Sequence, residues 1–413
     1  MCYTIPMVIN FRSLLCAISD ALDYVEKSMF GAKANHAKRV AFMSACIGRK
    51  AGLSDSEIAD LCACALLHDN ALAEYISDEQ QAGINVLVNK EAGNLGEHCV
   101  LGEDNVSSMP MYPRIKNVIL YHHERPDGQG PFGRKTEDTP FYAQIIHLTD
   151  LADIGFAGEK YNGRREQAVR AFIDKYRCTQ FESKTAELFE SCIGDGIINR
   201  LETEDAVTLL KESFPEKSKE YSNDEVIRLA SIFAHIVDYK SPFTRTHSIG
   251  IAQKAHAMAE YYGWPEEKQA EYYLAGALHD IGKLAVETDI LEKPAKLTDD
   301  EYKKIQFHAF ATWEMLRTIE GFENITEWAS YHHEKLDGTG YPFGKKADEL
   351  GMESRLMACL DIYQALTEDR PYRKGMSSEE AFAFLDKQAA LGKLDSDCIR
   401  DMKKALAEHI VIE

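Results

Sequence analysis

The sequence carries one series of histidine and aspartate residues twice, about 210 positions apart. The string LLHDN at 66–70 reappears as ALHDI at 277–281, and YHHERPDGQGPFGRK at 121–135 reappears as YHHEKLDGTGYPFGKK at 331–346. The two offsets agree, at 211 (279 − 68) and 210 (332 − 122) residues. Self-similarity at a fixed spacing is the signature of a repeated structural unit. We therefore expect two copies of one domain.

Three further pairs keep this register outside the matched strings. They join His36 to His247, His98 to His308 and Asp150 to Asp361. On this basis we predict a first domain over residues 1–160 and a second over residues 222–413. The intervening residues 161–221 are charged and favour helix, and FPEKSKEYSND within them is the expected linker.

Helical patterns dominate both copies. In EYYLAGALHDIGKL, Leu274, Leu278 and Ile281 recur at helical spacing. The segment SSEEAFAFLDKQAA opens with Ser, early acidic residues and an apolar stripe, which predicts a capped amphipathic helix. No run alternates strongly enough between apolar and polar residues to predict a sheet. The expected fold class is all-α, with two tandem helical bundle domains.

Charge and composition limit the kinds of partner. The formal net charge of -20 argues against a nucleic-acid duplex as partner, because a duplex is bound by basic surfaces. It permits a small phosphorylated ligand held by metal and a few local Lys and Arg side chains. No apolar run reaches the roughly 18 residues that span a bilayer, and residues 1–23 lack signal-peptide features and are expected to be helical. Ten scattered cysteines suggest reduced thiols, so we expect a cytoplasmic protein without a membrane span, which could form a homodimer.

The second copy gathers seven residues that can bind a divalent metal. Imidazole and carboxylate ligands together suit iron, manganese, nickel or zinc. Neighbouring residues on a helix point about 100 degrees apart, so an adjacent His–Asp pair can face two metals or hold one from two sides. Two close metals would bind a phosphate, lower the pKa of a water and stabilise a leaving oxygen, which suits phosphodiester hydrolysis. The candidates are His247, His279, Asp280, His308, His332, His333 and Asp361.

A structural role is the alternative for any one of these histidines. A single His on an apolar helix is more often a satisfied core residue, and an isolated HD dipeptide occurs by chance. All seven positions nevertheless recur in both copies, while the residues around them have diverged. This recurrence favours a metal site in the second copy.

The combination of LHDIGK with HHEKLDGTGYP resembles the HD-GYP family, a branch of the HD superfamily of metal-dependent phosphohydrolases. The resemblance covers most of residues 222–413 and includes SPFTRTHS and DIYQALTEDRPYRKGMS. It implies hydrolysis of cyclic di-GMP to pGpG, and in some members onward to GMP. Three alternatives stay open, namely a phosphodiesterase for 3′,3′-cGAMP or another cyclic dinucleotide, a sensor that binds without cleavage, and a diiron oxygenase.

The resemblance also assigns the candidate ligands to two metal ions. The first ion takes His247, His279, Asp280 and Asp361, and the second takes His308, His332 and His333, with Asp280 as the bridge. Iron or manganese is expected ahead of nickel, magnesium or zinc. Some family members carry a Glu one turn before the first His and bind three metals. Here that position is Phe243, so two ions are expected.

The remaining matched positions concern the substrate. The resemblance implies catalytic roles for Asp280 and Lys283, with Lys283 on the scissile phosphate, where it would neutralise an anionic oxygen. Two arginines match residues that hold the other phosphate or stack on guanine. The loop could contact the substrate or only brace the two adjacent histidines. These arginine and loop positions are Arg370, Arg373, Gly340, Tyr341 and Pro342.

The first copy keeps the ligands but not the residues that would handle phosphate. Leu72 stands at the position of Lys283, the Tyr of the loop is deleted, and the arginine pattern is missing. We interpret this copy as a weak or inactive regulatory partner that could still bind metal. A second active site with altered preference and a structural relic are the alternatives. Its candidate ligands are His36, His68, Asp69, His98, His122, His123 and Asp150.

Overall fold

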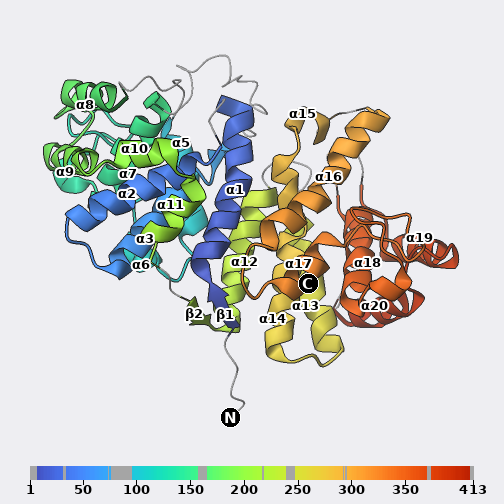
Figure 1. Ribbon diagram of the computed structural model, residues 1–413. Helices are drawn as coiled ribbons and strands as arrows, with labels where there is room; N and C mark the ends of the chain where they lie inside the picture. Colours follow the sequence, from blue (N-terminus) through green and yellow to red (C-terminus); the bar gives the residue numbers. More distant parts are fainter. Residues whose placement is uncertain are drawn as a thin grey trace, which may run out of the picture. The chain divides into compact units, whose positions relative to one another are not determined.

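The computed structural model divides the chain into two compact units. The N-terminal unit is Phe11–Ser218, and the C-terminal unit is Lys219–Glu413 joined by the strand that precedes Phe11 (Figure 1). The domain boundaries expected from the sequence stay predictions. The structure describes residues 7–30, 34–72, 74–75, 95–156, 165–215, 218–238, 247–291, 293, 295–369 and 374–409.

The N-terminal unit is a helical bundle arranged around α2. Helix α2 packs against α3, α7, α9 and α11, so the segment after residue 160 contributes to the same bundle as the first histidines. In chain order its elements are α1 (Phe11–Phe30), α2 (His36–Lys50), α3 (Asp55–Leu66), α5 (Leu95–Val106), α6 (Tyr112–Ile115), η1 (Thr136–Asp138), α7 (Phe141–Phe156), α8 (Arg165–Tyr176), α9 (Ser183–Gly194), α10 (Ile197–Thr203) and α11 (Ala206–Ser213).

The C-terminal unit repeats this plan with α13 and α14 at its centre. These two helices pack on each other, α12 lies against α14, and α18, α19 and α20 form a group that also contacts α13 (Figure 1). Its helices are α12 (Asn223–Asp238), α13 (His247–Tyr261), α14 (Glu266–Leu278), η2 (Ile281–Ala285), α15 (Thr288–Leu291), α16 (Asp299–Leu316), α17 (Glu323–Ser330), η3 (Ala347–Glu349), α18 (Met352–Thr367), α19 (Ser378–Ala390) and α20 (Ser396–His409).

The predicted all-α class is confirmed, with one local correction. The structure contains a two-stranded sheet in which β1 (Met7–Asn10) pairs with β2 (Ser218–Tyr221). The prediction of helix from the first residues onward was therefore wrong for Met7–Asn10, and helix begins at Phe11. Strands of four residues are too short for an alternating pattern to stand out in the sequence.

Helix starts follow local sequence signals. Ser377 caps α19 and accepts a hydrogen bond from the Glu380 backbone, while the Glu380 side chain accepts one from Ser377, so the predicted capped helix is present. Thr298 and Glu301 form the same reciprocal pair at α16. Each such cap satisfies backbone donors that have no partner within the helix. The caps therefore set where these helices begin and which residues face the interior.

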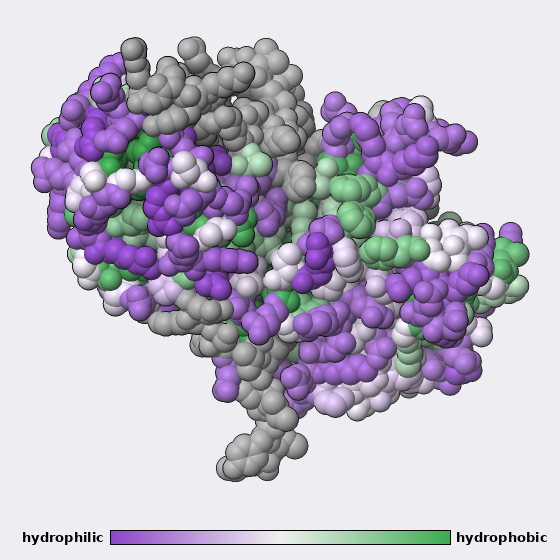
Figure 2. All heavy atoms as spheres, in the orientation of Figure 1, coloured by the Kyte–Doolittle hydropathy of each residue, from purple (hydrophilic) through white to green (hydrophobic). Residues whose placement is uncertain are grey.

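The buried residues form a helical core in each unit, and the visible surface is mostly hydrophilic (Figure 2). Leu274 and Leu278 on α14 and Ile281 beyond it are at most 1% exposed, as their spacing predicts. Among the helices that the structure describes, none is long and apolar enough to cross a membrane.

Gly282 allows η2 to pack closely against α16. A Cβ at this position would overlap the His308 carbonyl oxygen and would lie 2.6 Å from the Thr312 backbone nitrogen. The Gly282 amide also donates to Thr312 Oγ1 at 3.1 Å. In the N-terminal unit the glycine lies on the other segment of the contact. Ala71 stands at the position of Gly282, and Gly102 stands at the position of Thr312. A Cβ on Gly102 would lie 3.2 Å from Asn70 Nδ2 and 3.8 Å from Ala71 Cβ, so a glycine faces the matching segment in the N-terminal unit as well.

We expect Gly282→Ala to destabilise the C-terminal unit, because an added methyl group must separate η2 from α16. Overpacking of this kind costs about 1–3 kcal/mol, which urea denaturation monitored by circular dichroism would measure. Gly194→Ala is the matched control, since a Cβ there meets nothing within 4 Å. Equal midpoints for the two variants would show that the close approach is not needed.

Candidate metal centres

The structure brings together all seven C-terminal residues that the sequence singles out. They lie at the start of α13, after α14, within α16, after α17 and within α18, so five separate segments supply them. Six of them are buried and His333 is partly exposed. The residues are His247, His279, Asp280, His308, His332, His333 and Asp361.

Asp280 stands between two groups of histidines. Its Oδ2 atom lies 3.1 Å from His279 Nε2 and 3.8 Å from His247 Nε2. Its Oδ1 atom lies 3.4 Å from His308 Nε2 and 3.9 Å from His332 Nε2. One carboxylate oxygen therefore faces each group, which is the arrangement that a bridging ligand requires.

Asp361 also reaches both groups. Its Oδ1 atom lies 3.3 Å from His247 Nε2, and its Oδ2 atom lies 3.6 Å from His333 Nδ1. The resemblance assigned this residue to one metal only. The geometry instead places a carboxylate oxygen beside each histidine group.

Backbone carbonyls orient the histidine rings. The Nδ1 atoms of His279, His308 and His332 lie within hydrogen-bond distance, at 2.8, 2.6 and 2.6 Å, of the carbonyl oxygens three residues before each. With Nδ1 donating, each Nε2 is left as a free ligand atom that points toward the centre. His279 Nε2 and Asp280 Oδ1 are buried without a hydrogen-bond partner. Buried polar atoms without partners are costly, so these two acceptor atoms fit a divalent cation.

Glu368 orients the remaining buried histidine. Its Oε2 atom lies 3.2 Å from His247 Nδ1, which leaves His247 Nε2 toward the two aspartates. The sequence analysis did not identify this residue. A carboxylate seven positions after Asp361 has no distinctive spacing that would single it out. In the N-terminal unit Asp153 orients His36 in the same way, with Oδ2 2.8 Å from His36 Nδ1, but it stands only three positions after Asp150.

Burial sets most of the histidines in the neutral form that binds metal. It lowers the pKa of His308 to about 4 and that of His333 to about 3. The pKa of Asp280 moves well below its usual range, because His279 and Lys283 outweigh the effect of burial. His247 differs, since Asp361 and Glu368 overcome burial and raise its pKa to about 9. A metal binding there must displace a proton.

Lys283 lies beside the bridging carboxylate. Its ammonium group donates to Asp280 Oδ2, and the side chain is 22% exposed. Burial alone would lower its pKa, but Asp280 raises it above the ordinary value, so the ammonium stays charged at neutral pH. Arg370, Arg373 and Phe243 lie outside the described residues.

The loop containing Gly340 and Tyr341 packs against the two adjacent histidines. The Tyr341 ring lies 4.6 Å from the His333 ring, between centroids, and the Tyr341 amide donates to the His333 carbonyl at 3.2 Å. A Cβ on Gly340 would lie 2.5 Å from Glu334 Cα. The bracing role considered in the sequence analysis therefore has direct contacts, and Pro342 follows Tyr341 through a cis peptide bond.

Glu334 binds the backbone of this loop, and the sequence analysis did not identify it. Its side chain is buried and accepts hydrogen bonds from the backbone amides of Phe343 at 2.7 Å and Lys345 at 3.0 Å. Glu124 follows the histidine pair of the N-terminal unit and accepts from Phe132 at 2.7 Å. The repeat itself offered the signal, because HHE occurs in both copies.

The N-terminal unit reproduces the bridging arrangement. Asp69 Oδ2 lies 3.4 Å from His68 Nε2, while Asp69 Oδ1 lies 3.6 Å from His98 Nε2 and 3.7 Å from His122 Nε2. The other three expected ligands are near. Asp150 Oδ1 lies 3.2 Å from His36 Nε2, and the His123 ring lies 4.0 Å from the His122 ring, between centroids.

A thiol adds to the N-terminal group. Cys99 Sγ lies 3.7 Å from His98 Nε2 and 3.8 Å from His122 Nδ1. Burial alone would raise the pKa of Cys99, but the two histidines outweigh it and lower that pKa to about 6. The sequence analysis missed this residue, since Ala309 stands at the matching position and the repeat gave no signal.

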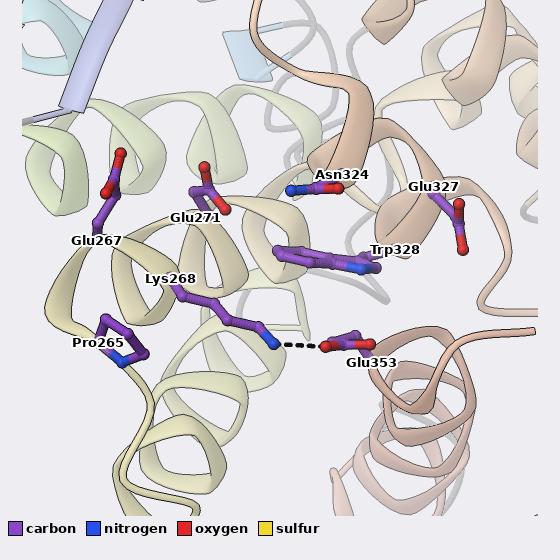
Figure 3. Close-up of a pocket in the computed structure, with 8 residues that line it drawn as sticks. All are labelled: Pro265, Glu267, Lys268, Glu271, Asn324, Glu327, Trp328 and Glu353. Carbon is purple, nitrogen blue, oxygen red and sulfur yellow. Dashed lines mark hydrogen bonds and ion pairs between the residues drawn. The ribbon is translucent and has the colours of Figure 1, made fainter.

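A separate pocket of about 550 Å³ lies away from these residues, between α14, α17 and the start of α18 (Figure 3). Glu267, Glu271 and Glu327 surround it, and Lys268 Nζ pairs with Glu353 Oε1 at 2.5 Å. Lys268 is the one cationic side chain among the described lining residues, and its pairing with Glu353 neutralises its charge. An acidic pocket of this kind does not suit a phosphorylated substrate.

Comparisons with known proteins agree on one family. Models described as HD domain match residues 34–154 and 231–398. The 3′3′-cGAMP-specific phosphodiesterase 1 of Vibrio cholerae is 31% identical over 399 residues, which cover 94% of this chain and 90% of that protein. A cyclic di-GMP phosphodiesterase of Pseudomonas aeruginosa is 39% identical over 142 residues, or 34% of each chain. The crystal structure of V-cGAP3, a cyclic GMP-AMP phosphodiesterase of V. cholerae, covers 97% of this chain and 98% of its own, with a TM-score of 0.66 and 23% identity, and shares the fold.

We expect Glu334→Ala to loosen the loop that braces His333, because the backbone amides of Phe343, Gly344 and Lys345 lose a charged acceptor. Hydrogen bonds to charged groups contribute about 1.5–3 kcal/mol, so exchange of the Phe343 and Lys345 amides should accelerate roughly tenfold or more. Hydrogen–deuterium exchange with peptide-level mass spectrometry would measure this. Glu320→Ala, an exposed acid before α17, is the control. Unchanged protection in Glu334→Ala would refute the bracing role.

Proposed function

Because the chain belongs to the HD-GYP family of cyclic dinucleotide phosphodiesterases, we propose that its C-terminal unit is the active one and that it hydrolyses 3′3′-cGAMP ahead of cyclic di-GMP. The observation that carries the proposal is the seven-residue cluster around Asp280, with Lys283 beside it. In the N-terminal unit Leu72 stands at the position of Lys283 and is 7% exposed.

The order of the two substrates rests on how much of the chain each relative resembles. The relative named for 3′3′-cGAMP matches both repeated units, over 94% of this chain. The relative named for cyclic di-GMP is more similar, at 39% identity, but over only 34% of the chain. Sequence alone favoured cyclic di-GMP, which stays as the second candidate.

The cluster would hold two divalent ions. His247 and His279 would hold the first, His308, His332 and His333 the second, and Asp280 and Asp361 have an oxygen facing each. The ions would polarise a phosphoryl oxygen and lower the pKa of the attacking water. Their identity is proposed as iron or manganese, since imidazole and carboxylate ligands suit both.

Lys283 would bind a non-bridging oxygen of the scissile phosphate. Its ammonium is charged at neutral pH and already donates to Asp280, which fixes the long side chain at the edge of the cluster. An ammonium has three donors, so one can hold Asp280 while another meets the phosphate. A preorganised donor of this kind stabilises charge that develops in the transition state.

Asp280 and the loop would position the reacting groups. Asp280 fixes the separation of the two histidine groups through its two oxygens. The Tyr341 ring lies against the His333 ring and would help to hold that histidine in place. The N-terminal unit lacks this tyrosine and the lysine, so we propose that it does not catalyse hydrolysis and acts as a regulatory or structural partner.

Substitution of the paired residues in each unit tests where hydrolysis occurs. We expect His279→Ala combined with Asp280→Ala to abolish hydrolysis of both cyclic dinucleotides, because the first histidine group and the bridge are lost. The matched pair His68→Ala and Asp69→Ala should retain hydrolysis. Chromatography of the products and metal quantification would be run on all variants. Full activity in the first double variant would place the active centre elsewhere.

Removal of the lysine tests its role separately from metal binding. Lys283→Ala should lower kcat about 100-fold, since loss of one preorganised donor has an effect of this size, while the metal content stays unchanged. Lys303→Ala is the control, because the Lys303 side chain is 73% exposed. A Lys283→Ala enzyme with unaltered kcat would rule out the phosphate contact.

The substrate order is tested by incubating the purified chain with each dinucleotide, with manganese or ferrous iron supplied. We expect a higher kcat/KM for 3′3′-cGAMP than for cyclic di-GMP. A reversed order would reinstate cyclic di-GMP as the main substrate. No hydrolysis of either with any metal would overturn the proposed function.

A further inference from the structure

Cys99 is the one described cysteine that lies within a group of metal-binding side chains. It follows His98 on α5, is fully buried, and is grouped with His98, His122 and His123. One candidate ligand atom from each of the four lies within 4.8 Å of all the others. Among the described residues, the other eight cysteines join no such group.

The matching group of the C-terminal unit has one member fewer. It consists of His308, His332 and His333, and the residue after His308 is Ala309. Alanine has no donor atom. The N-terminal group therefore holds a fourth side-chain donor that its duplicate lacks.

The distance between the Cys99 and His98 ligand atoms suits a tetrahedral centre. With bonds of about 2.3 Å to sulfur and about 2.0 Å to nitrogen, two ligand atoms at a tetrahedral angle stand about 3.5 Å apart. Cys99 Sγ lies 3.7 Å from His98 Nε2, close to this value. His122 Nδ1 lies 2.6 Å from the Ile119 carbonyl oxygen, and its Nε2 atom is buried without a hydrogen-bond partner. The Nε2 atom is thus the one available to a metal.

We propose that the N-terminal unit binds a divalent metal through a thiolate, with Cys99, His98, His122 and His123 as ligands, and that this site takes zinc in preference to manganese or magnesium. The thiol releases its proton to solvent on binding. A soft sulfur ligand selects zinc over the harder cations that carboxylates favour. Sets of cysteine and histidine ligands are typical of zinc sites, and Asp69 Oδ1 faces the same group, 3.6 Å from His98 Nε2.

This assignment gives the N-terminal unit a role that its missing lysine does not contradict. The thiolate would fill a coordination position that no side chain fills in the matching C-terminal group, because Ala309 has no donor atom. The two units would then carry different metals within one duplicated scaffold. The assignment does not depend on the proposed hydrolysis, because it concerns only ligation in the N-terminal unit.

Cobalt substitution of the full-length chain tests the thiolate directly. Co²⁺ bound by a thiolate absorbs through a sulfur-to-metal charge-transfer band in the near ultraviolet, which histidine and carboxylate ligands do not produce. We expect this band in the wild-type chain and its complete loss in Cys99→Ala, which installs the residue of the C-terminal copy. Cys64→Ala, which removes a buried thiol of α3 in the same unit, should retain the band. Absence of the band in the wild type, or its persistence in Cys99→Ala, would overturn the proposal.

X-ray absorption of the zinc-loaded wild-type chain gives a second measurement that needs no variant. A sulfur neighbour at about 2.3 Å from zinc is expected. A first shell made of nitrogen and oxygen alone contradicts thiolate ligation. Because neither readout uses enzyme activity, failure here leaves the hydrolase proposal intact, and failure of the hydrolase assays leaves this one intact.

Discussion

One carboxylate in each unit determines how the surrounding helices must be arranged. Asp280 and Asp69 each turn one oxygen toward a histidine at the end of a helix and the other toward histidines from different segments. A buried carboxylate is stable only when charges or donors surround it. Helices that supply those donors must therefore converge on this point, and the bundle is built so that they do.

Close packing makes that convergence possible. The residues after the His–Asp pair must approach the helix that supplies the isolated histidine, and a small residue is needed at the contact. The C-terminal unit places it at Gly282 against Thr312, and the N-terminal unit places it at Gly102 against Ala71. A glycine thus lies at the contact in both units, but on opposite partners.

The two units differ most in what surrounds an otherwise similar group of ligands. The C-terminal unit adds Lys283 at the bridging carboxylate and Tyr341 against His333. The N-terminal unit has Leu72 in place of the lysine and adds Cys99 beside His98 and His122. Changes of single residues around a common scaffold thus give the two groups of ligands different chemical surroundings.

The sequence by itself determined the duplication, the all-α class and the candidate ligands, because repeated His and Asp positions and helical periodicity are visible along the chain. Only the tertiary structure decided which oxygen of Asp280 faces which histidine, that Asp361 reaches both groups, and that Cys99 joins the N-terminal group. Those facts depend on where separate helices meet, and sequence spacing does not encode that. Glu334 lies between the two cases, since its recurrence after each histidine pair was visible but its hydrogen bonds to the loop were not. The short β1–β2 pairing joins residues about 210 positions apart and was also decided by the fold.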